Sequence, residues 1–201
     1  MAGDPGEPEA IRLLAEALSD PEADVRELAA AALSEFGAGA RAAVPALIRA
    51  VQDENPVVRR RAIRAIAIVG PDAGEDALSE VITATDDLED GVALQAIATL
   101  GEFGPSAASA IPALMSAIWT GDVRRRAVAG AALTRMGAAA VPFLVQSLSH
   151  PAPEVRSKCA HLLGSLGPIA RDVRPALQLL VDDRDEGVRA ATDQALRRIV
   201  E

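Results

Sequence analysis

Cysteine and histidine, which serve most often in nucleophilic and metal chemistry, are rare in this 201-residue chain and are limited to Cys159, His150 and His161. A metal site needs several His, Cys or carboxylate ligands around one ion, and a nucleophile needs an oriented base beside it. Cys159 and His161 are two residues apart, so on a helix they would point about 200° apart. We therefore interpret Cys159 as a core residue and His161 as an inner-face residue. We expect no metal site and no cofactor.

Glycine pairs and adjacent carboxylates are the other candidates for chemistry. The segments Gly101–Gly104 and Gly164–Gly167 end predicted helices instead of opening them, so they do not form a phosphate-binding loop. Three pairs of adjacent acids fall in predicted turns, where solvated acids are common: Asp86-Asp87, Glu89-Asp90 and Asp182-Asp183. Trp119 ends a predicted helix, and we interpret it as a packing residue. No residue is predicted to be catalytic, and we expect the protein not to be an enzyme.

Basic side chains are unevenly distributed along this chain of net charge −9. Six segments hold 14 Arg or Lys and four Asp or Glu, whereas the remainder holds six basic and 25 acidic residues. These segments are 25–36, 58–69, 92–103, 124–136, 155–166 and 188–199. An acidic chain can thus present a basic strip, which would attract a protein or peptide of acidic character.

This strip supplies the predicted partner-binding residues. They are Arg60, Arg61, Arg64, Arg135, Lys158, His161 and Arg197. Structural explanations stay open for some of them. Cations in the last turn of a helix complement its dipole, which fits Arg135 and Arg197. Arg60 lies one repeat after Glu27 at the same position, so the two can pair.

The helices that position the strip follow from two recurring phrases. One starts at Val25, Val58, Val92, Arg125, Val155 and Val188, and its first five copies end in a Gly twelve residues later. Apolar residues lie at offsets 0, 4, 8 and 11, which share one helix face. The other phrase carries Pro45, Pro112, Pro142 or Pro175 near the start of an apolar run. Proline suits a first helical turn, and glycine suits a helix C-terminus.

The two phrases alternate, so each unit reads as helix, Asp-rich turn, helix and Gly turn. The predicted units are 8–37, 39–70, 72–104, 106–137, 138–167 and 169–200. One helix pair cannot bury its apolar face alone, whereas stacked pairs bury a continuous core. We predict an all-α chain, a solenoid of about six helix pairs that forms a single domain over residues 1–201.

The residues of the second unit carry a resemblance to a known family. Asp53-Glu54-Asn55-Pro56-Val57-Val58-Arg59, followed by Ala62, Ala65, Ile66 and Gly70, resembles the short bacterial HEAT-like repeat, which also occurs in phycobilisome bilin lyase subunits. The resemblance covers nearly the whole chain. It implies a right-handed superhelix with the first helix of each pair on the convex face and the second on the concave face.

The resemblance also implies a structural role for the arginine that follows the Val of the phrase. This position is held by Arg26, Arg59, Arg126, Arg156 and Arg189. Each would tie adjacent units together through an Asp in a turn. Ala93 replaces the arginine in the third unit, which predicts a looser seam or a bend near the middle of the chain.

We predict a non-enzymatic scaffold that binds a protein or peptide on its concave face. Small residues on that face have two explanations, close approach of the helices or a smooth groove for a ligand. One alternative is an enzyme-associated subunit like the bilin lyases. Another is duplex nucleic-acid binding along the basic strip, as in the HEAT-like alkylpurine glycosylases, which the net charge of −9 and the four aromatic residues disfavour.

The termini and the single cysteine suggest a location. One cysteine allows no internal disulfide, the first residues lack the pattern of a signal peptide, and no run of about 18 apolar residues is present. We expect a cytoplasmic protein without a membrane segment. Leu196, Ile199 and Val200 end the chain without a polar capping helix, which would favour self-association or a longer natural chain. The sequence gives no oligomeric state.

Overall fold

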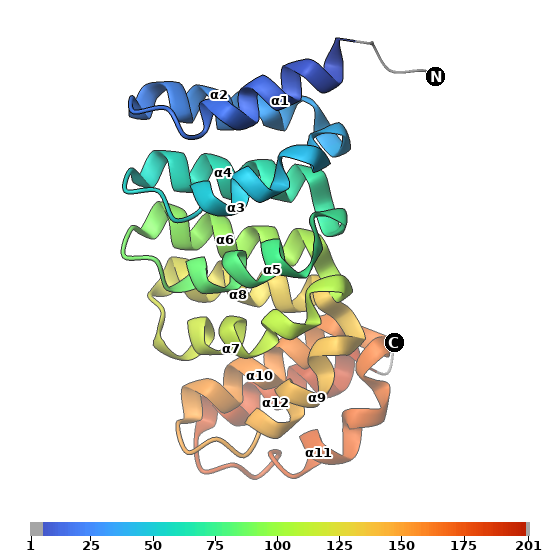
Figure 1. Cartoon of the computed structure of the whole chain (residues 1–201). Helices are drawn as coiled ribbons and strands as arrows, with labels where there is room; N and C mark the ends of the chain where they lie inside the picture. The colour runs from blue at the N-terminus through green and yellow to red at the C-terminus, as the bar shows by residue number, and fades with distance from the viewer. Residues whose placement is uncertain (1–5, 200–201) are drawn as a thin grey trace. The chain divides into compact units, whose positions relative to one another are not determined.

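The computed structural model describes residues 6–199, and every regular element among them is helical (Figure 1). The chain divides into two compact units, Met1–Phe103 and Gly104–Glu201. Val200, in the last predicted helix pair, lies outside the described residues, as do the first five residues of the N-terminus. Because the two units are compact by themselves, each is described separately.

The first unit contains three helix pairs. Their helices are α1 (Glu7–Ala17), α2 (Ala23–Glu35), α3 (Val44–Ala50), α4 (Pro56–Val69), α5 (Gly74–Thr83) and α6 (Asp90–Phe103). The even-numbered helices stack into one layer, with α4 between α2 and α6, and the odd-numbered helices form the other layer (Figure 1). Each odd-numbered helix packs against the even-numbered helix that follows it.

The second unit repeats this arrangement. Its helices are α7 (Ile111–Thr120), α8 (Val123–Met136), α9 (Val141–Ser147), α10 (Pro153–Leu166), α11 (Arg174–Gln178) and α12 (Glu186–Arg198). Here α10 packs against both α8 and α12, and α7, α9 and α11 cover them on one side. The predicted all-α helical-repeat solenoid is confirmed over residues 6–199, with helix ends within a few residues of the predicted ones.

The buried face of the even-numbered helices follows the predicted periodicity. Leu33, Ile66 and Leu163, at offset 8 of three repeats, are completely buried. Val58 at offset 0 is also buried, but Val25 at the same offset is 38% exposed. Val25 belongs to the first helix pair, and no helix pair among the described residues precedes it to cover this position.

The helix ends use the predicted proline and glycine chemistry. Proline occupies one of the first two positions of α3, α7, α9 and α11, where its missing N–H is not needed. A glycine with a positive φ follows α2, α4, α6, α8 and α10, with φ +79° at Gly70 and +61° at Gly137. A residue with a Cβ would be strained there, so glycine lets the chain reverse into a short 3₁₀ segment.

One stretch of the described residues, Val123–Ser147, is long enough to cross a membrane and contains an 18-residue window that is apolar enough, with a mean hydropathy of 1.6 in that window. It comprises α8 and α9, and the backbone turns between them at Gly137, so it is not one straight helix. Leu133, Met136 and Leu144 within it are fully buried in the second unit. Core helices of folded domains meet the same criterion, so length and composition are weak evidence here.

Adjacent helix pairs of the first unit are joined across their turns by arginine. Arg26 donates to both carboxylate oxygens of Asp53, at 2.7 and 2.9 Å, and to the carbonyl oxygens of Asp20 and Pro21. The guanidinium therefore joins the turn of its own helix pair to the turn of the next. Both side chains are nearly buried, with 9% and 10% of their surface exposed.

The same contact repeats one helix pair further along, between Arg59 and Asp87. Arg59 donates to both oxygens of Asp87 at 2.8 Å and to the Asp53 carbonyl oxygen at 2.9 Å. In the second unit, Arg156 makes the equivalent bonds to Asp183, at 2.7 and 2.9 Å. We call these three bidentate ion pairs the turn ladder.

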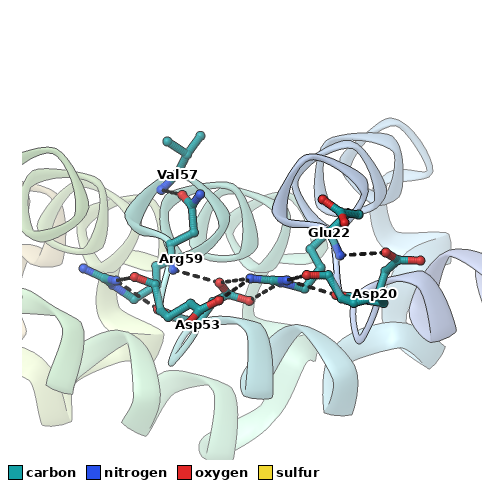
Figure 2. A network of polar contacts seen from close by, with 9 residues as sticks. Asp20, Glu22, Asp53, Val57 and Arg59 are labelled. Atoms are coloured by element: carbon teal, nitrogen blue, oxygen red, sulfur yellow. Dashed lines mark hydrogen bonds and ion pairs between the residues drawn. The ribbon is translucent and has the colours of Figure 1, made fainter.

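Each aspartate of the turn ladder also closes its own turn. An Asp53 carboxylate oxygen accepts the backbone N–H of Asn55 at 2.9 Å, and Asp183 does the same for Asp185. Asp20 accepts the N–H of Glu22 in the first turn at the same distance (Figure 2). The carboxylate thus holds the turn in shape while it binds the arginine of the preceding helix pair.

The turn ladder lowers the pKa of two of its carboxylates, Asp53 and Asp183. Burial acts to raise the pKa of Asp53, but hydrogen bonds from Arg26 and the Asn55 amide outweigh it and hold the pKa below its ordinary value. The pKa of Asp183 is lowered chiefly by its hydrogen bond from Arg156. A pKa that is lower in the folded state stabilises the fold above the unfolded-state value of about 4. That contribution is lost as the pH falls through the folded-state value.

We predict that Arg59→Gln lowers the free energy of unfolding by about 1–3 kcal/mol, because it leaves Asp87 without its bidentate partner. Arg60→Gln, at the next and exposed position of α4, should change it by less than about 0.5 kcal/mol. Urea unfolding followed by circular dichroism measures both. Equal losses in the two variants would contradict a stabilising role for the turn ladder.

We predict that Asp53→Asn lowers the unfolding free energy at neutral pH and that this deficit shrinks as the pH falls from 5 towards 3. The reason is that protonation removes the Asp53 contribution from the wild-type protein as well. Unfolding curves at several pH values would show the convergence. Asp72→Asn, at an exposed residue, serves as the control, and a deficit independent of pH would argue against an ionised Asp53.

Candidate functional site

The predicted basic strip of the first unit lies on α4 and is partly paired within the protein. Arg61 contacts Glu27 of α2 at 3.2 Å, and Arg64 contacts Glu102 of α6 at 3.6 Å. The predicted pairing of Arg60 with Glu27 is wrong, since the neighbouring Arg61 takes that carboxylate. All three arginines are exposed, and ion pairs at exposed sites contribute little to stability. These arginines can therefore exchange their partners at little cost.

The predicted basic residues of the second unit lie on all three even-numbered helices. Arg135 lies in the last turn of α8, Lys158 and His161 lie on α10, and Arg197 lies near the end of α12. Arg135, His161 and Arg197 are exposed, and Lys158 is half-buried. Among residues 6–199, none of these four side chains forms an ion pair. In the second unit, the positive charges of the basic strip are therefore not neutralised by ion pairs among the described residues.

Lys158 lies across a close contact between two helices. A Cβ on Gly130 of α8 would be 3.5 Å from the Lys158 Cε and 3.4 Å from a methyl of Leu162. The side chain of Lys158 therefore runs from α10 over α8, and its apolar stem covers the glycine. This position brings its ammonium group to the surface between the two helices.

The small residues of the even-numbered layer include one that close packing requires. A Cβ on Gly164 of α10 would be only 2.7 Å from the Cα of Ala195 in α12. At this contact the two backbones approach too closely for any side chain on Gly164. Crowding explains Gly164, whereas Ala127 and Ala131 on α8 are exposed and leave a smooth surface.

Cys159 and His161 point in different directions, as their spacing predicts. Cys159 is completely buried, and burial raises the pKa of its thiol to about 12, which keeps it protonated and unreactive. His161 is exposed on the surface of α10. In the part of the chain that the structure describes, no group of three or more His, Cys, Asp or Glu side chains is arranged to hold a metal ion.

Two of the five repeat arginines depart from the turn ladder. Among residues 6–199, the side chain of Arg189 in the last helix pair donates only to the carbonyl oxygens of its own turn, those of Asp183 and Arg184. Arg126 donates through Nε to the Gly121 carbonyl oxygen at 2.6 Å, is exposed, and forms no ion pair among the described residues. The turn that should supply its aspartate has His150 at that position.

His150 lies against the only tryptophan of the sequence. The rings of Trp119 and His150 stack with their centroids 5.6 Å apart and an angle of 23° between their planes. Trp119 is 42% exposed, so the sequence-based interpretation as a packing residue describes only part of its surroundings. It lines a hollow of about 440 Å³ together with Met115, Phe143 and His150.

Trp119 also lines a second hollow between α8 and α10, which we call the Trp119 groove. It has a volume of about 670 Å³ and lies between the end of α7 and the starts of α8 and α10. Its lining includes Trp119, Val123, Arg126, Glu154, Val155 and Lys158. Sequence reasoning missed this site. The sequence did contain a signal for it. The turn residue six positions before each repeat arginine is an aspartate at Asp183, before Arg189, but a histidine at His150, before Arg156.

A sequence profile of HEAT repeats matches residues 11–98, 44–134 and 119–197. No curated protein sequence matches the chain significantly. An engineered protein of known structure aligns with a TM-score of 0.57 and 19% identity, over 94% of this chain and 96% of that one. A designed armadillo repeat protein aligns with a TM-score of 0.53 and 19% identity, over 94% and 99%.

A natural protein is similar at the same level. The complex of CpcE and CpcF of phycocyanin lyase from Nostoc sp. PCC7120 aligns with a TM-score of 0.55 and 23% identity. The alignment covers 95% of this chain and 77% of that chain. At these identities the structural likeness shows the fold alone.

We predict that Gly164→Ala destabilises the protein by about 1–3 kcal/mol, because the added methyl forces α10 and α12 apart. Gly130→Ala is the matched control, since its Cβ meets only the flexible ends of Lys158 and Leu162. It should be neutral or stabilising, by up to about 1 kcal/mol, from the better helix propensity of alanine. Thermal and urea unfolding of both variants test this, and an equally stable Gly164→Ala would rule out the close contact.

Proposed function

Because the chain belongs to the family of HEAT repeats, which its residues resemble, we propose that it is a non-catalytic scaffold that binds a protein or peptide of acidic character. The proposed surface is the layer of even-numbered helices within each unit. Assignment of that layer to a concave face stays a prediction from the resemblance. HEAT repeats present extended surfaces built from successive helices, and such surfaces suit protein segments better than small substrates.

The unpaired cations of the second unit carry this proposal. Arg135, Lys158, His161 and Arg197 lie on α8, α10 and α12, and none has an ion pair among residues 6–199. Many of the aspartates and glutamates among residues 6–199 lie in the turns between the helices. A basic strip bordered by acidic turns attracts an acidic segment and orients it along the layer.

The partner is therefore expected to be a protein segment rather than a nucleic acid. The net charge of −9 opposes binding to a long phosphate backbone. Aromatic side chains for stacking of bases number four in the whole chain, and one of them, Phe103, is buried. A short acidic peptide needs only the few cations of one unit.

We predict that replacing Arg135 and Arg197 together with Glu weakens binding of acidic peptides by at least about tenfold, since each exposed pair is worth up to about 1 kcal/mol and reversal makes it repulsive. The probe is the set of 12-residue peptides selected from a random display library on the full chain. Affinities are measured by fluorescence polarisation. The double variant Arg171→Glu with Arg174→Glu, which changes the same charge on the other layer, should bind within about twofold of wild type.

Three outcomes would contradict the proposal. If the selected peptides contained no excess of Asp and Glu, the prediction of an acidic partner would be wrong. Equal binding by the two double variants would remove the even-numbered layer as the surface. Tighter binding to a DNA duplex than to the selected peptides at physiological salt would favour a nucleic-acid partner instead.

A further inference from the structure

Arg126 stands at a position where the three arginines of the turn ladder hold an aspartate. Arg26, Arg59 and Arg156 use Nε and one terminal nitrogen on the two oxygens of a carboxylate from the next turn. Arg126 uses Nε on a backbone carbonyl oxygen instead, and its two terminal nitrogens form no hydrogen bond among the described residues. We call the donor groups of a guanidinium that bind a carboxylate in this way its fork. The fork of Arg126 binds no carboxylate among the described residues, and we describe it as open.

His150 explains the open fork, because it replaces the aspartate in the turn but not its charge. Its Nδ1 accepts the N–H of Ala152 at 3.1 Å, as the Asp53 carboxylate accepts the N–H of Asn55. Its carbonyl oxygen accepts from Arg156 at 2.9 Å, as that of Asp53 accepts from Arg59. The turn is therefore intact. An imidazole, however, offers no pair of anionic oxygens to an arginine.

The Trp119 groove lies beside the open fork and has both apolar and basic surfaces. Val123 is 81% exposed and Trp119 is 42% exposed, while Val155 forms a buried part of the lining. Arg126 and Lys158 supply two positive charges against the single negative charge of Glu154. A ligand that covers the exposed apolar side chains and also pairs with the cations must carry an apolar side chain close to a carboxylate.

We propose that the Trp119 groove anchors a segment of a partner protein in which an Asp or Glu lies close to a bulky apolar residue. The partner's carboxylate binds the Arg126 fork in the way that Asp53, Asp87 and Asp183 bind theirs. The apolar side chain packs on Trp119 and Val123, and Lys158 adds a second cation at the rim. This anchor rests on the proposed function, because it names the contact by which the scaffold holds its acidic partner.

The geometry favours a protein segment over a small carboxylate. The exposed walls of the groove, formed by Trp119 and Val123, would stay wet on one side of a small molecule. A peptide covers such walls with its own backbone and neighbouring side chains, and a bidentate carboxylate contact fixes its register. An aromatic residue and an arginine side by side are also the side chains most enriched where binding energy concentrates.

Two substitutions of His150 distinguish an effect on the Arg126 fork from an effect on the stability of the fold. His150→Asp supplies the missing aspartate from within the chain, so it should close the fork of Arg126 and compete with the partner. His150→Asn keeps a turn acceptor of similar size without the charge. We expect His150→Asp to weaken the selected 12-residue peptides by at least about tenfold, and His150→Asn to weaken them by less than about threefold.

Arg126→Gln tests the fork directly and should also weaken binding by at least about tenfold. Arg124→Gln removes the same charge from an exposed position of the same helix and should have an effect below about threefold. Replacing the acidic residue of the best peptide by its amide should cost as much as Arg126→Gln does, and should cost nothing further in that variant. Circular dichroism and thermal unfolding check the fold, and His150→Asp should melt no lower than His150→Asn.

The outcomes distinguish this anchor from the broader function. If Arg135→Glu with Arg197→Glu weakens the peptides while His150→Asp and Arg126→Gln do not, the scaffold function stands and the anchor is wrong. If neither set has an effect, both are wrong. Displacement of the peptides by millimolar acetate or free glutamate would make the groove a small-anion site. Dimerisation of the chain that Arg126→Gln abolishes, detected by sedimentation, would make a second copy the occupant, and either result overturns the proposal.

Discussion

The contact on which the structure depends is the bidentate ion pair between an arginine of one helix pair and an aspartate in the turn of the next. Several of the odd-numbered helices are too short to be stable alone, with five residues in α11 and seven in α3 and α9. Their place is set by neighbours and by the turns that join them. An aspartate that shapes its own turn and also binds the preceding arginine couples the local conformation to the stacking of the pairs (Figure 2).

Such an ion pair stabilises the stacking of helix pairs because it is nearly buried and because nearly all of its hydrogen-bond donors have an acceptor. The arginine fork of Arg26 meets two carboxylate oxygens and two backbone carbonyl oxygens, so its donors are satisfied where water has little access. The apolar core beneath consists of small and medium side chains, and its close packing leaves few ways to shift one pair against the next. The turns and the core therefore specify the same register in each unit.

The second unit departs from this pattern at one turn, and the departure creates the features that distinguish its surface. His150 closes its turn but leaves Arg126 without an aspartate, and Trp119 stacks on the imidazole where a charged ladder would otherwise run. Natural proteins often break a local structural rule at the site of function and compensate for it elsewhere. Here Arg156 and Asp183 restore the turn ladder in the next helix pair.

Much of the fold could be predicted from the sequence because it depends on local spacing. Apolar residues at offsets 0, 4, 8 and 11 define one helix face, proline starts helices, and glycine with a positive φ ends them, so six helix pairs follow from the chain alone. The basic residues of the even-numbered helices could likewise be named from sequence. Their pairing could not, because it depends on which side chains of adjacent helices come within reach, as Arg61 rather than Arg60 does for Glu27. The state of Arg126 and the Trp119 groove were also decided by tertiary structure, since a missing partner and a hollow exist only between helix pairs. The sequence determines which side chains lie on the helix face that meets the adjacent helix. The distances between side chains of adjacent helices, which only the tertiary structure sets, determine which of them pair.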